Sequence, residues 1–492
     1  MPFDIAIVAA EVVPFSKSGG LGDVCGALAA ALALAGHRVV TVSPRYRTID
    51  PAQFDLRDTG FEISVPLGGH EHRARLLQTV QDGVTHWLVD SPVYDRDGLY
   101  GDRFGSFGDN HLRFTLLCHA ALQAARSLPI ADGKPLGDSP IFHVHDWHTA
   151  LLPVLLEASY RPLGLFKKAA TVLTLHNPAH QGRLPASSFL ELELPPRWFM
   201  PGGLEFHGDL GLLKGGILYA DRVTTVSPQF AQETLTADGG FGLDPLLAGR
   251  QGAYVGVLNG IDGQSYNPRT DKALEAPFDV DDLDGRALCK AALQTELGLP
   301  VDATVPLVGT VGRLDPQKGV ELLLDAIPWL AAEGAQVVVL GSAAAAHASW
   351  EQRLRELERR FPRQVRAWIG FNDAVSRRIY GGSDLFVMPS LFEPCGLSQM
   401  YAMRYGAIPV VRATGGLADT VTDLDQPNAT GVSFVAPTGH ALRTALWRGL
   451  QLLADADAHA VVQRRGMSTD WSWTSRIPAW ETIYGQAAAQ RG

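Results

Sequence analysis

The feature that most constrains the fold of this chain is a pattern that occurs twice: an apolar run, a glycine-containing turn and a helix-forming stretch. In the first half, residues 5–10 are apolar, residues 17–23 read KSGGLGD, and an Ala/Leu-rich stretch follows. In the second half, residues 305–311 are apolar, residues 312–319 form the turn, and a helical stretch extends to about residue 332. Such βαβ units indicate parallel sheets covered by helices. The sequence therefore predicts an α/β protein with two Rossmann-like domains.

The domain boundaries follow from where this pattern stops and restarts. Further strands are predicted at residues 38–42, 84–89, 141–144, 170–175, 223–226 and 254–258, and again at 336–340, 365–369, 384–388, 408–411 and 431–435. Residues 263–303 contain no apolar run and are predicted to be a linker with one helix near 285–297. The predicted domains are 1–265, 266–470 and a closing helix in 471–492. Ligands bind beyond the carboxyl ends of strands in such folds, so the active site is expected in the cleft between the domains.

Composition excludes several classes of function. A chain of 492 residues is too long for one hydrophobic core. The 42 basic and 52 acidic residues give a net charge of −10, which disfavours a general nucleic-acid binder. The four cysteines form no CxxC pair, and neither a signal peptide nor an apolar run of about 18 residues is present. We expect a cytoplasmic protein without a disulfide framework, a membrane span or a nucleic-acid partner.

Two glycine loops are candidate anion sites. Gly19 and Gly20 allow backbone N–H groups to face an anion at a helix start, and Lys17 adds a cation. Residues 413–419 (ATGGLAD) repeat the arrangement after a later strand. The first loop is neither a P-loop nor the G-x-G-x-x-G fingerprint, because Cys25 stands where the third glycine belongs. The alternative for the first loop is an ordinary strand-to-helix turn.

Charged residues after the strands of the second half are candidates for binding a diphosphate and hydroxyl groups. Arg313 offers a bidentate fork and Lys318 a point charge, both appropriate for a diphosphate. Glu393 is placed to accept hydrogen bonds from hydroxyl groups at the mouth of a sheet, and Cys395 is favoured as a packed residue over a nucleophile. The alternatives are a solvated basic turn for the first pair and a helix cap for Glu393.

A histidine-rich segment, residues 143–148 (HVHDWH), admits two interpretations. Its histidines and Asp146 suggest a metal site, but no known zinc spacing is present. Hydrogen bonding of sugar hydroxyls by Asp146 and by His176 at strand ends is favoured, and we expect no metal. Trp147 offers an aromatic face to a sugar ring or is simply part of the core.

Taken together and in this order, these segments resemble the bacterial glycogen synthase and plant starch synthase family, glycosyltransferase family 5. The resemblance covers nearly the whole chain and rests on residues 10–21, HDWH at 145–148, LNGID at 258–262, PSLFEPCGLSQ at 389–399 and RATGGLADTV at 412–421. It implies the GT-B fold, with a C-terminal helix that returns to the first domain. It implies glucose transfer from ADP-glucose to the 4-hydroxyl of an α-1,4-glucan with retention at the anomeric carbon. No metal and no cofactor are implied.

The resemblance also implies roles for individual residues. Arg313 and Lys318 should hold the diphosphate and, with His176 and Glu393, form the catalytic set. The other donor contacts implied are Lys17, Gly19, Gly20, Phe371, Cys395, Gly396, Thr414, Gly415 and Gly416. The sugar and acceptor side is implied for Asp23, Asp146, Trp147, Asn177 and Asn259. The backbone carbonyl of His176 is expected to stabilise positive charge on the sugar.

Three departures from the family pattern and three rival functions accompany this interpretation. Ser18 replaces the usual Thr, Phe371 replaces a more usual Tyr, and residues 177–180 read NPAH in place of NLAY. None removes a charged catalytic group, so an active enzyme is predicted. The rivals are a UDP-glucose-dependent or other GT-B transferase, a non-catalytic glucan-binding protein, and a nicotinamide-dependent oxidoreductase, which lacks its fingerprint here.

Overall fold

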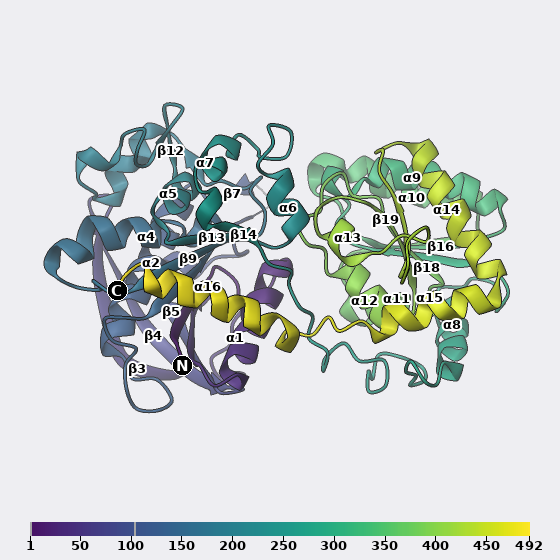
Figure 1. Ribbon diagram of the computed structural model, residues 1–492, viewed down its shortest axis with the longest axis horizontal. Coiled ribbons are helices and arrows are strands. Elements are labelled where there is room, and N and C mark those ends of the chain that lie inside the picture. Colours follow the sequence, from purple (N-terminus) through teal and green to yellow (C-terminus); the bar gives the residue numbers. More distant parts are fainter. Residues whose placement is uncertain (1, 103–104) are drawn as a thin grey trace. The chain divides into compact units, whose positions relative to one another are not determined.

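Two compact units make up the chain, each with its own sheet and hydrophobic core (Figure 1). The computed structural model describes residues 2–102 and 105–492. The N-terminal unit comprises Met1–Gly260 and Trp473–Gly492, and the C-terminal unit comprises Ile261–Ser472. The predicted α/β class with parallel sheets is confirmed in both units.

The N-terminal unit is built on a nine-stranded sheet of order β14-β13-β9-β8-β1-β2-β5-β4-β3. The strands are β1 (Asp4–Val8), β2 (Arg38–Pro44), β3 (Arg57–Leu67), β4 (His70–Gln81), β5 (Val84–Asp90), β8 (Ile141–His145), β9 (Ala170–Leu175), β13 (Arg222–Thr225) and β14 (Tyr254–Gly256). The seven strands from β14 to β5 are parallel. Central strands such as β8 and β9 are buried along their whole length, which explains their unbroken apolar runs.

The edge of this sheet was not predicted. Strands β3 and β4 pair antiparallel with each other, and β4 pairs antiparallel with β5. Their side chains alternate between exposed and buried positions, because one face of the hairpin lies in solvent. Polar residues therefore interrupt the apolar runs by which the other strands were found.

Helices and short strands complete the N-terminal unit. The helices are α1 (Gly20–Leu34), α2 (Asn110–Ser127), α3 (Asp146–Thr149), α4 (Leu151–Leu155), α5 (Leu212–Tyr219), α6 (Pro228–Glu233) and α7 (Asp244–Ala248), with a π turn at Leu156–Tyr160. Short 3₁₀ turns lie at Pro92–Tyr94, Arg161–Leu163, Ala186–Leu192, Pro196–Trp198 and Gln251–Ala253. Two small sheets pair β6 (Gly101–Asp102) with β7 (Gly105–Ser106), and β12 (Asp209–Gly211) with β10 (Arg183–Leu184) and β11 (Glu205–Phe206).

The C-terminal unit has a six-stranded parallel sheet of order β17-β16-β15-β18-β19-β20. Its strands are β15 (Leu307–Val311), β16 (Gln336–Gly341), β17 (Val365–Ile369), β18 (Leu385–Met388), β19 (Ile408–Arg412) and β20 (Val432–Phe434). Its helices are α8 (Asp284–Glu296), α9 (Val320–Ala332), α10 (Ala348–Arg360), α11 (Asp373–Gly382), α12 (Ser398–Arg404), α13 (Gly415–Thr420), α14 (Gly439–Ala454) and α15 (Ala456–Ser468), with 3₁₀ turns at Pro316–Lys318 and Ala345–His347. Helix α8 confirms the single helix predicted within 263–303.

The last helix packs on the N-terminal unit, as the resemblance implied. After a 3₁₀ turn at Thr474–Arg476, α16 (Ile477–Ala489, yellow in Figure 1) lies against β8, β9 and β13. Its Tyr484 hydroxyl shares a 2.9 Å hydrogen bond with Nδ1 of His143, and the Trp480 ring lies 4.8 Å from the same imidazole. Both aromatic side chains are buried, so they anchor the helix to the sheet.

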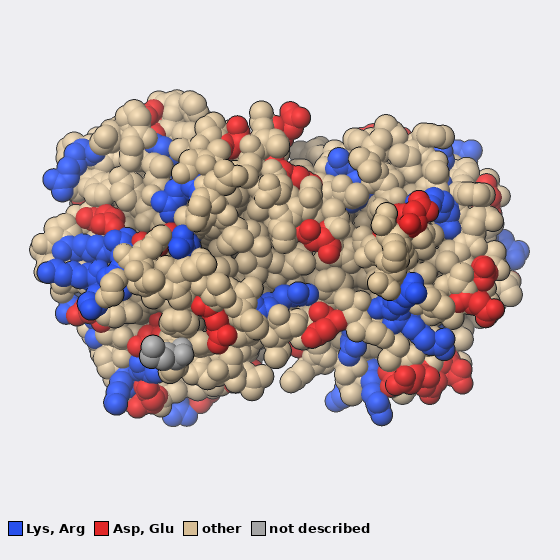
Figure 2. Space-filling view, in the orientation of Figure 1, with Lys and Arg blue, Asp and Glu red and all other residues tan. Residues whose placement is uncertain are grey.

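The surface carries charges of both signs. On the face drawn in Figure 2, basic and acidic side chains are interspersed over both units. No helix in the described part of the chain is long and apolar enough to cross a membrane. All four cysteines are buried free thiols.

Candidate active site

A buried carboxylate fixes the first glycine loop. Glu11 is 2% exposed, and its carboxylate accepts hydrogen bonds from the Ser18 amide, the Ser18 hydroxyl (2.6 Å) and the Tyr100 hydroxyl. The serine that departs from the family pattern therefore uses its hydroxyl to hold the loop. Sequence reasoning assigned no role to Glu11 or Tyr100.

The cation of this loop is already paired. Lys17 Nζ lies 2.8 Å from Oδ2 of Asp23, in the first turn of α1, and both side chains are partly exposed. Gly19 precedes the helix, and a Cβ placed there would meet no atom within 4 Å. The start of α1 is thus open to a ligand, with one positive and one negative side chain beside it.

Asp146 supports the backbone at His176 instead of presenting a free carboxylate. Its Oδ1 accepts hydrogen bonds from the amides of His176 (2.7 Å) and Asn177 (3.4 Å). Asp146 adopts a positive φ of 55° and is buried, and this burial raises the pKa of its carboxyl to about 7. Sequence reasoning predicted a sugar contact here, and the structure adds that Asp146 orients the peptide at His176.

The His176 side chain is held by a second histidine. Its Nε2 shares a 2.9 Å hydrogen bond with Nδ1 of His145, which is completely buried. Burial lowers the pKa of His176 to about 3, so the imidazole is neutral at ordinary pH. The residue is positioned to act through its backbone or as a neutral hydrogen-bonding group.

The loop that departs from the family pattern has its own supports. The Asn177 side chain accepts a hydrogen bond from the Ala179 amide (3.1 Å), and Gln181 donates to the carbonyl of Phe241 (2.8 Å). A Cβ at Gly182 would lie 2.5 Å from the Trp147 ring, so that ring packs closely on the loop. Trp147 also packs against Phe114 and is half-buried, and Asn259 is buried just after β14.

In the C-terminal unit, Lys318 and Glu393 form a close pair. Lys318 Nζ lies 2.6 Å from Oε2 of Glu393, which also accepts a 3.0 Å hydrogen bond from the Ser390 hydroxyl. The Lys318 side chain is 27% exposed and that of Glu393 is 5% exposed. The structure thus brings together the residues predicted to bind diphosphate and sugar hydroxyls.

The two loops that carry this pair are locked together. Gly319 has a φ of 65°, and a Cβ there would lie 2.0 Å from the carbonyl oxygen of Pro389. The Leu391 amide donates to the carbonyl of Gln317 (2.7 Å). Arg313 lies in the same turn, its side chain is 59% exposed, and its Nη1 is 3.7 Å from Oδ2 of Asp315. Its guanidinium is therefore available to a ligand.

The second glycine loop differs from the prediction at one amide. The Gly416 N–H donates to the backbone carbonyls of Glu393 (3.0 Å) and Pro394 (3.2 Å), so it is occupied within the protein. A Cβ at Gly416 would lie 2.1 Å from the carbonyl oxygen of Cys395, so the residue serves close packing of two loops. Thr414 and Gly415, which has a φ of 45°, begin α13 beside it.

The remaining donor candidates divide into one exposed and two packed positions. Phe371 follows β17 and is 77% exposed. Cys395 is 4% exposed, and Gly396 adopts a positive φ. The Gln399 side chain donates hydrogen bonds to the backbone carbonyls of Cys395 (3.1 Å) and Gly396 (2.9 Å). Sequence reasoning did not identify Gln399 as a support of this loop.

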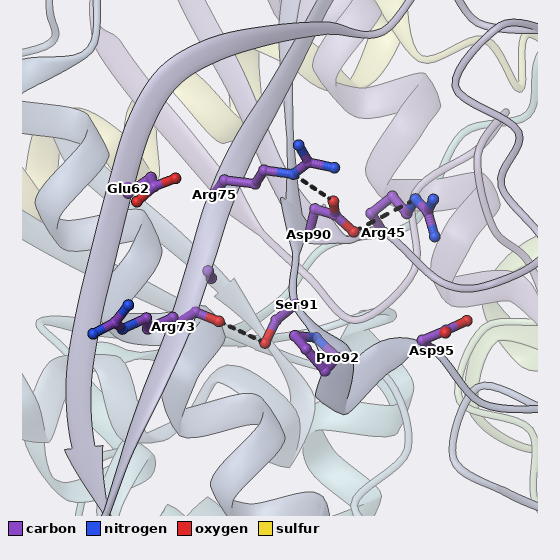
Figure 3. Close-up of a pocket in the computed structure, with 9 residues that line it drawn as sticks. Arg45, Glu62, Arg73, Arg75, Asp90, Ser91, Pro92 and Asp95 are labelled. Atoms are coloured by element: carbon purple, nitrogen blue, oxygen red, sulfur yellow. Dashed lines mark hydrogen bonds and ion pairs between the residues drawn. The ribbon is translucent and has the colours of Figure 1, made fainter.

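One cavity of the N-terminal unit lies apart from these residues. It has a volume of about 470 Å³ and is lined by Arg73 and Arg75 of β4, Asp90 of β5 and Arg45, which follows β2 (Figure 3). Nε of Arg75 lies 2.8 Å from Oδ2 of Asp90, so the basic charge that lines the cavity is partly neutralised. None of the predicted site residues lines it, and we do not assign it to the donor.

The fold consists of two units with parallel sheets and a C-terminal helix that packs on the first unit. With the Lys–Glu pair at the carboxyl ends of the second sheet, this architecture is that of a GT-B glycosyltransferase. The family described as the starch synthase catalytic domain matches residues 4–249, and glycosyl transferases group 1 matches residues 298–451. The chain belongs to the starch synthase and glycogen synthase family. Its activity is that of a glycogen or starch synthase: elongation of α-1,4-glucan from ADP-glucose.

Individual relatives are similar over nearly the whole chain. Glycogen synthase of Anaeromyxobacter sp. is 43% identical, with 99% of this chain and 100% of the relative covered. Soluble starch synthase 1 of Oryza sativa is 43% identical, with 98% and 77% covered. The catalytic domain of starch synthase IV from Arabidopsis thaliana, solved with ADP and acarbose, superposes with a TM-score of 0.91 at 34% identity, covering 99% and 100%.

Proposed function

We propose that Arg313 and Lys318 bind the diphosphate of ADP-glucose and stabilise the charge that develops on it as the glycosidic bond breaks. The proposal rests on the 2.6 Å contact between Lys318 and Glu393, which places a cation beside a carboxylate suited to sugar hydroxyls. The exposed guanidinium of Arg313 adds a second cation in the same turn. A fixed cation next to a developing anion lowers the barrier, because no solvent has to reorganise.

The glucose is proposed to be held by Glu393 and to face the backbone of His176. Asp146 accepts hydrogen bonds from the amides of His176 (2.7 Å) and Asn177 (3.4 Å). The Asn177 amide shares its peptide plane with the His176 carbonyl, so this contact would orient that carbonyl toward positive charge on the sugar. The exposed Phe371 ring is proposed to stack on the adenine. Lys17, Gly19 and Gly20 are proposed as further donor contacts, with Asn177 and Asn259 on the acceptor side.

The reaction is proposed to retain the anomeric configuration by a front-face displacement. The bond between the anomeric carbon and the phosphate oxygen breaks while the acceptor 4-hydroxyl oxygen forms the new bond on the same face. The hydroxyl proton passes to the departing phosphate oxygen. Cys395 is buried and Glu393 is paired with Lys318, so neither side chain is presented as a nucleophile. Trapping of a covalent glucosyl-enzyme would contradict this step.

We also propose that transfer needs no metal or cofactor, because Arg313 and Lys318 supply the positive charge. Rates in excess EDTA should equal those of untreated enzyme, and a rate restored only by Mg²⁺ would contradict the proposal. The buried free thiols are consistent with work in the reducing cytoplasm, where glycogen would be the acceptor.

The decisive experiment is release of nucleoside diphosphate with glycogen as acceptor, comparing ADP-glucose and UDP-glucose at equal concentration. We expect a strong preference for ADP-glucose and an α-linked product by NMR. Preference for UDP-glucose would keep the chemistry and overturn the base assignment at Phe371. Release from neither donor would favour a binding protein without activity.

A further inference from the structure

We propose that Cys25, His145 and His176 form a binding site for a zinc-like divalent cation and that occupation of this site inhibits the enzyme. One potential ligand atom of each residue lies within 4.8 Å of the other two. In the described part of the chain, these three residues form the cluster of His, Cys, Asp or Glu side chains close enough together to hold an ion. One thiol and two imidazoles are the donors that Zn²⁺ prefers.

The three donors stand on rigid parts of the N-terminal unit. Cys25 lies in α1, His145 ends β8 and His176 follows β9. Cys25 and His145 are completely inaccessible, whereas His176 is half-buried and connects the cluster to the surface. The Nε2 atom of His145 is buried without a hydrogen-bond partner in the described structure. A buried nitrogen of this kind is costly to leave unpaired, and the site offers it a use.

Charge around the cluster favours a cation. Burial lowers the pKa of both histidines, so they are neutral and keep a lone pair for a metal. The pKa of the Cys25 thiol is raised by burial and by the nearby Asp146 and Glu11 carboxylates. Those carboxylates oppose a lone thiolate but attract a divalent cation. As the sulfur–metal bond forms, the thiol proton leaves to water.

The geometry needs only a small adjustment. Zinc lies about 2.3 Å from sulfur and about 2.0 Å from nitrogen, so ligands of a tetrahedral ion are about 3.3–3.6 Å apart. Because the donor atoms lie within 4.8 Å of one another, they would close by up to about 1.2–1.5 Å through side-chain rotation. The 2.9 Å hydrogen bond between His145 and His176 would be exchanged for metal bonds. A water molecule would complete the coordination.

Inhibition follows from the place of His176. A metal would fix its imidazole in a new position and strain the peptide that Asp146 orients. This second half of the inference rests on the proposed role of His176 at the sugar, whereas metal binding itself does not. The two halves therefore need separate readouts.

Binding is tested by titrating chelator-treated, full-length enzyme with Co²⁺ and recording the sulfur-to-cobalt charge-transfer band. Surface histidines also take up metals, so the sulfur band, and not total uptake, is the readout. The matched variants are Cys25→Ala and Cys118→Ala, because both cysteines are completely buried in the same unit. The band should appear in the wild type and in Cys118→Ala and be lost in Cys25→Ala. No band in the wild type, or an equal band in Cys25→Ala, would overturn the site.

Folding and inhibition are controlled separately. If Cys25→Ala is unfolded by circular dichroism, His145→Asn in the same titration takes its place and should also lose the band. Zn²⁺ should inhibit ADP release reversibly, with EDTA restoring the rate. The Zn²⁺ concentration for half-inhibition should be at least tenfold higher for Cys25→Ser than for Cys118→Ala. Cobalt binding through sulfur without zinc inhibition would overturn the inhibitory half and leave the diphosphate assignment untouched.

Discussion

Replacement of Lys318 by alanine should damage both turnover and stability, and the two effects can be separated. Lys318 Nζ lies 2.6 Å from a Glu393 carboxylate whose side chain is 5% exposed. Removing the lysine leaves that carboxylate buried with only the Ser390 hydroxyl as a partner for the same oxygen. It also removes a cation from the proposed diphosphate site.

The magnitudes follow from this geometry. Breaking a fully buried ion pair costs about 3–5 kcal/mol, and an exposed pair is worth at most about 1 kcal/mol. Because the Lys318 side chain is 27% exposed, we expect Lys318→Ala to lower the free energy of unfolding by about 1–3 kcal/mol. Turnover should fall at least about tenfold, which corresponds to about 1.4 kcal/mol in the barrier.

The assay is a double-mutant comparison. Urea unfolding and ADP release are measured for Lys318→Ala, Glu393→Gln and the double variant. The double variant should recover much of the lost stability, because no unpaired carboxylate remains, but it should not recover turnover. Unchanged turnover in Lys318→Ala would remove this residue from the diphosphate site. Recovery of turnover in the double variant would show that Lys318 acts only as a structural partner.

Three further predictions concern the pH dependence of stability, the turn at Gly319 and the first glycine loop at Ser18. Burial lowers the pKa of His86 to about 4, so its contribution to stability is complete above pH about 6.5 and is lost as the pH falls through 4. The free energy of unfolding should fall by up to about 3 kcal/mol over this range. In unfolding titrations at several pH values, His86→Gln should flatten this decline. Gly319→Ala should lower the melting temperature by several degrees or prevent folding, because the Cβ would meet the carbonyl of Pro389; a wild-type melting temperature would contradict that contact. Ser18→Ala removes the 2.6 Å bond to Glu11 and should cost about 1 kcal/mol of stability and raise the KM for donor, whereas Ser18→Thr should not.

The sequence predicted the strands and helices whose burial can be recognised from a short run of neighbouring residues. Parallel strands such as β8 and β9 are buried on both faces, so their apolar runs are visible without any knowledge of their neighbours. The β3–β4 hairpin was missed because half of its side chains face water. Alternation over residues 62–67 and 71–80 was the available signal for that hairpin.

Partners within the site were harder to predict than the site residues themselves. Lys318 and Glu393 were each identified, but 75 positions separate them, and only the fold brings them to 2.6 Å. Glu11 and Tyr100 were missed for the same reason, since they are 89 positions apart in the sequence. Local sequence specifies which residue types are present, whereas pairing depends on how the sheet orders its strands.

The two glycine loops show how similar sequences acquire different chemistry. Both place a Gly-Gly pair at a helix start, and sequence reasoning treated both as phosphate-binding backbones. In the first loop, Gly19 is open and exposed. In the second, the Gly416 amide is already bonded to the Glu393 carbonyl. We therefore expect neutralisation of the donor diphosphate in the C-terminal unit to depend more on Arg313 and Lys318 than on the Gly416 amide. This division explains why a single substitution at Lys318 is expected to be so costly.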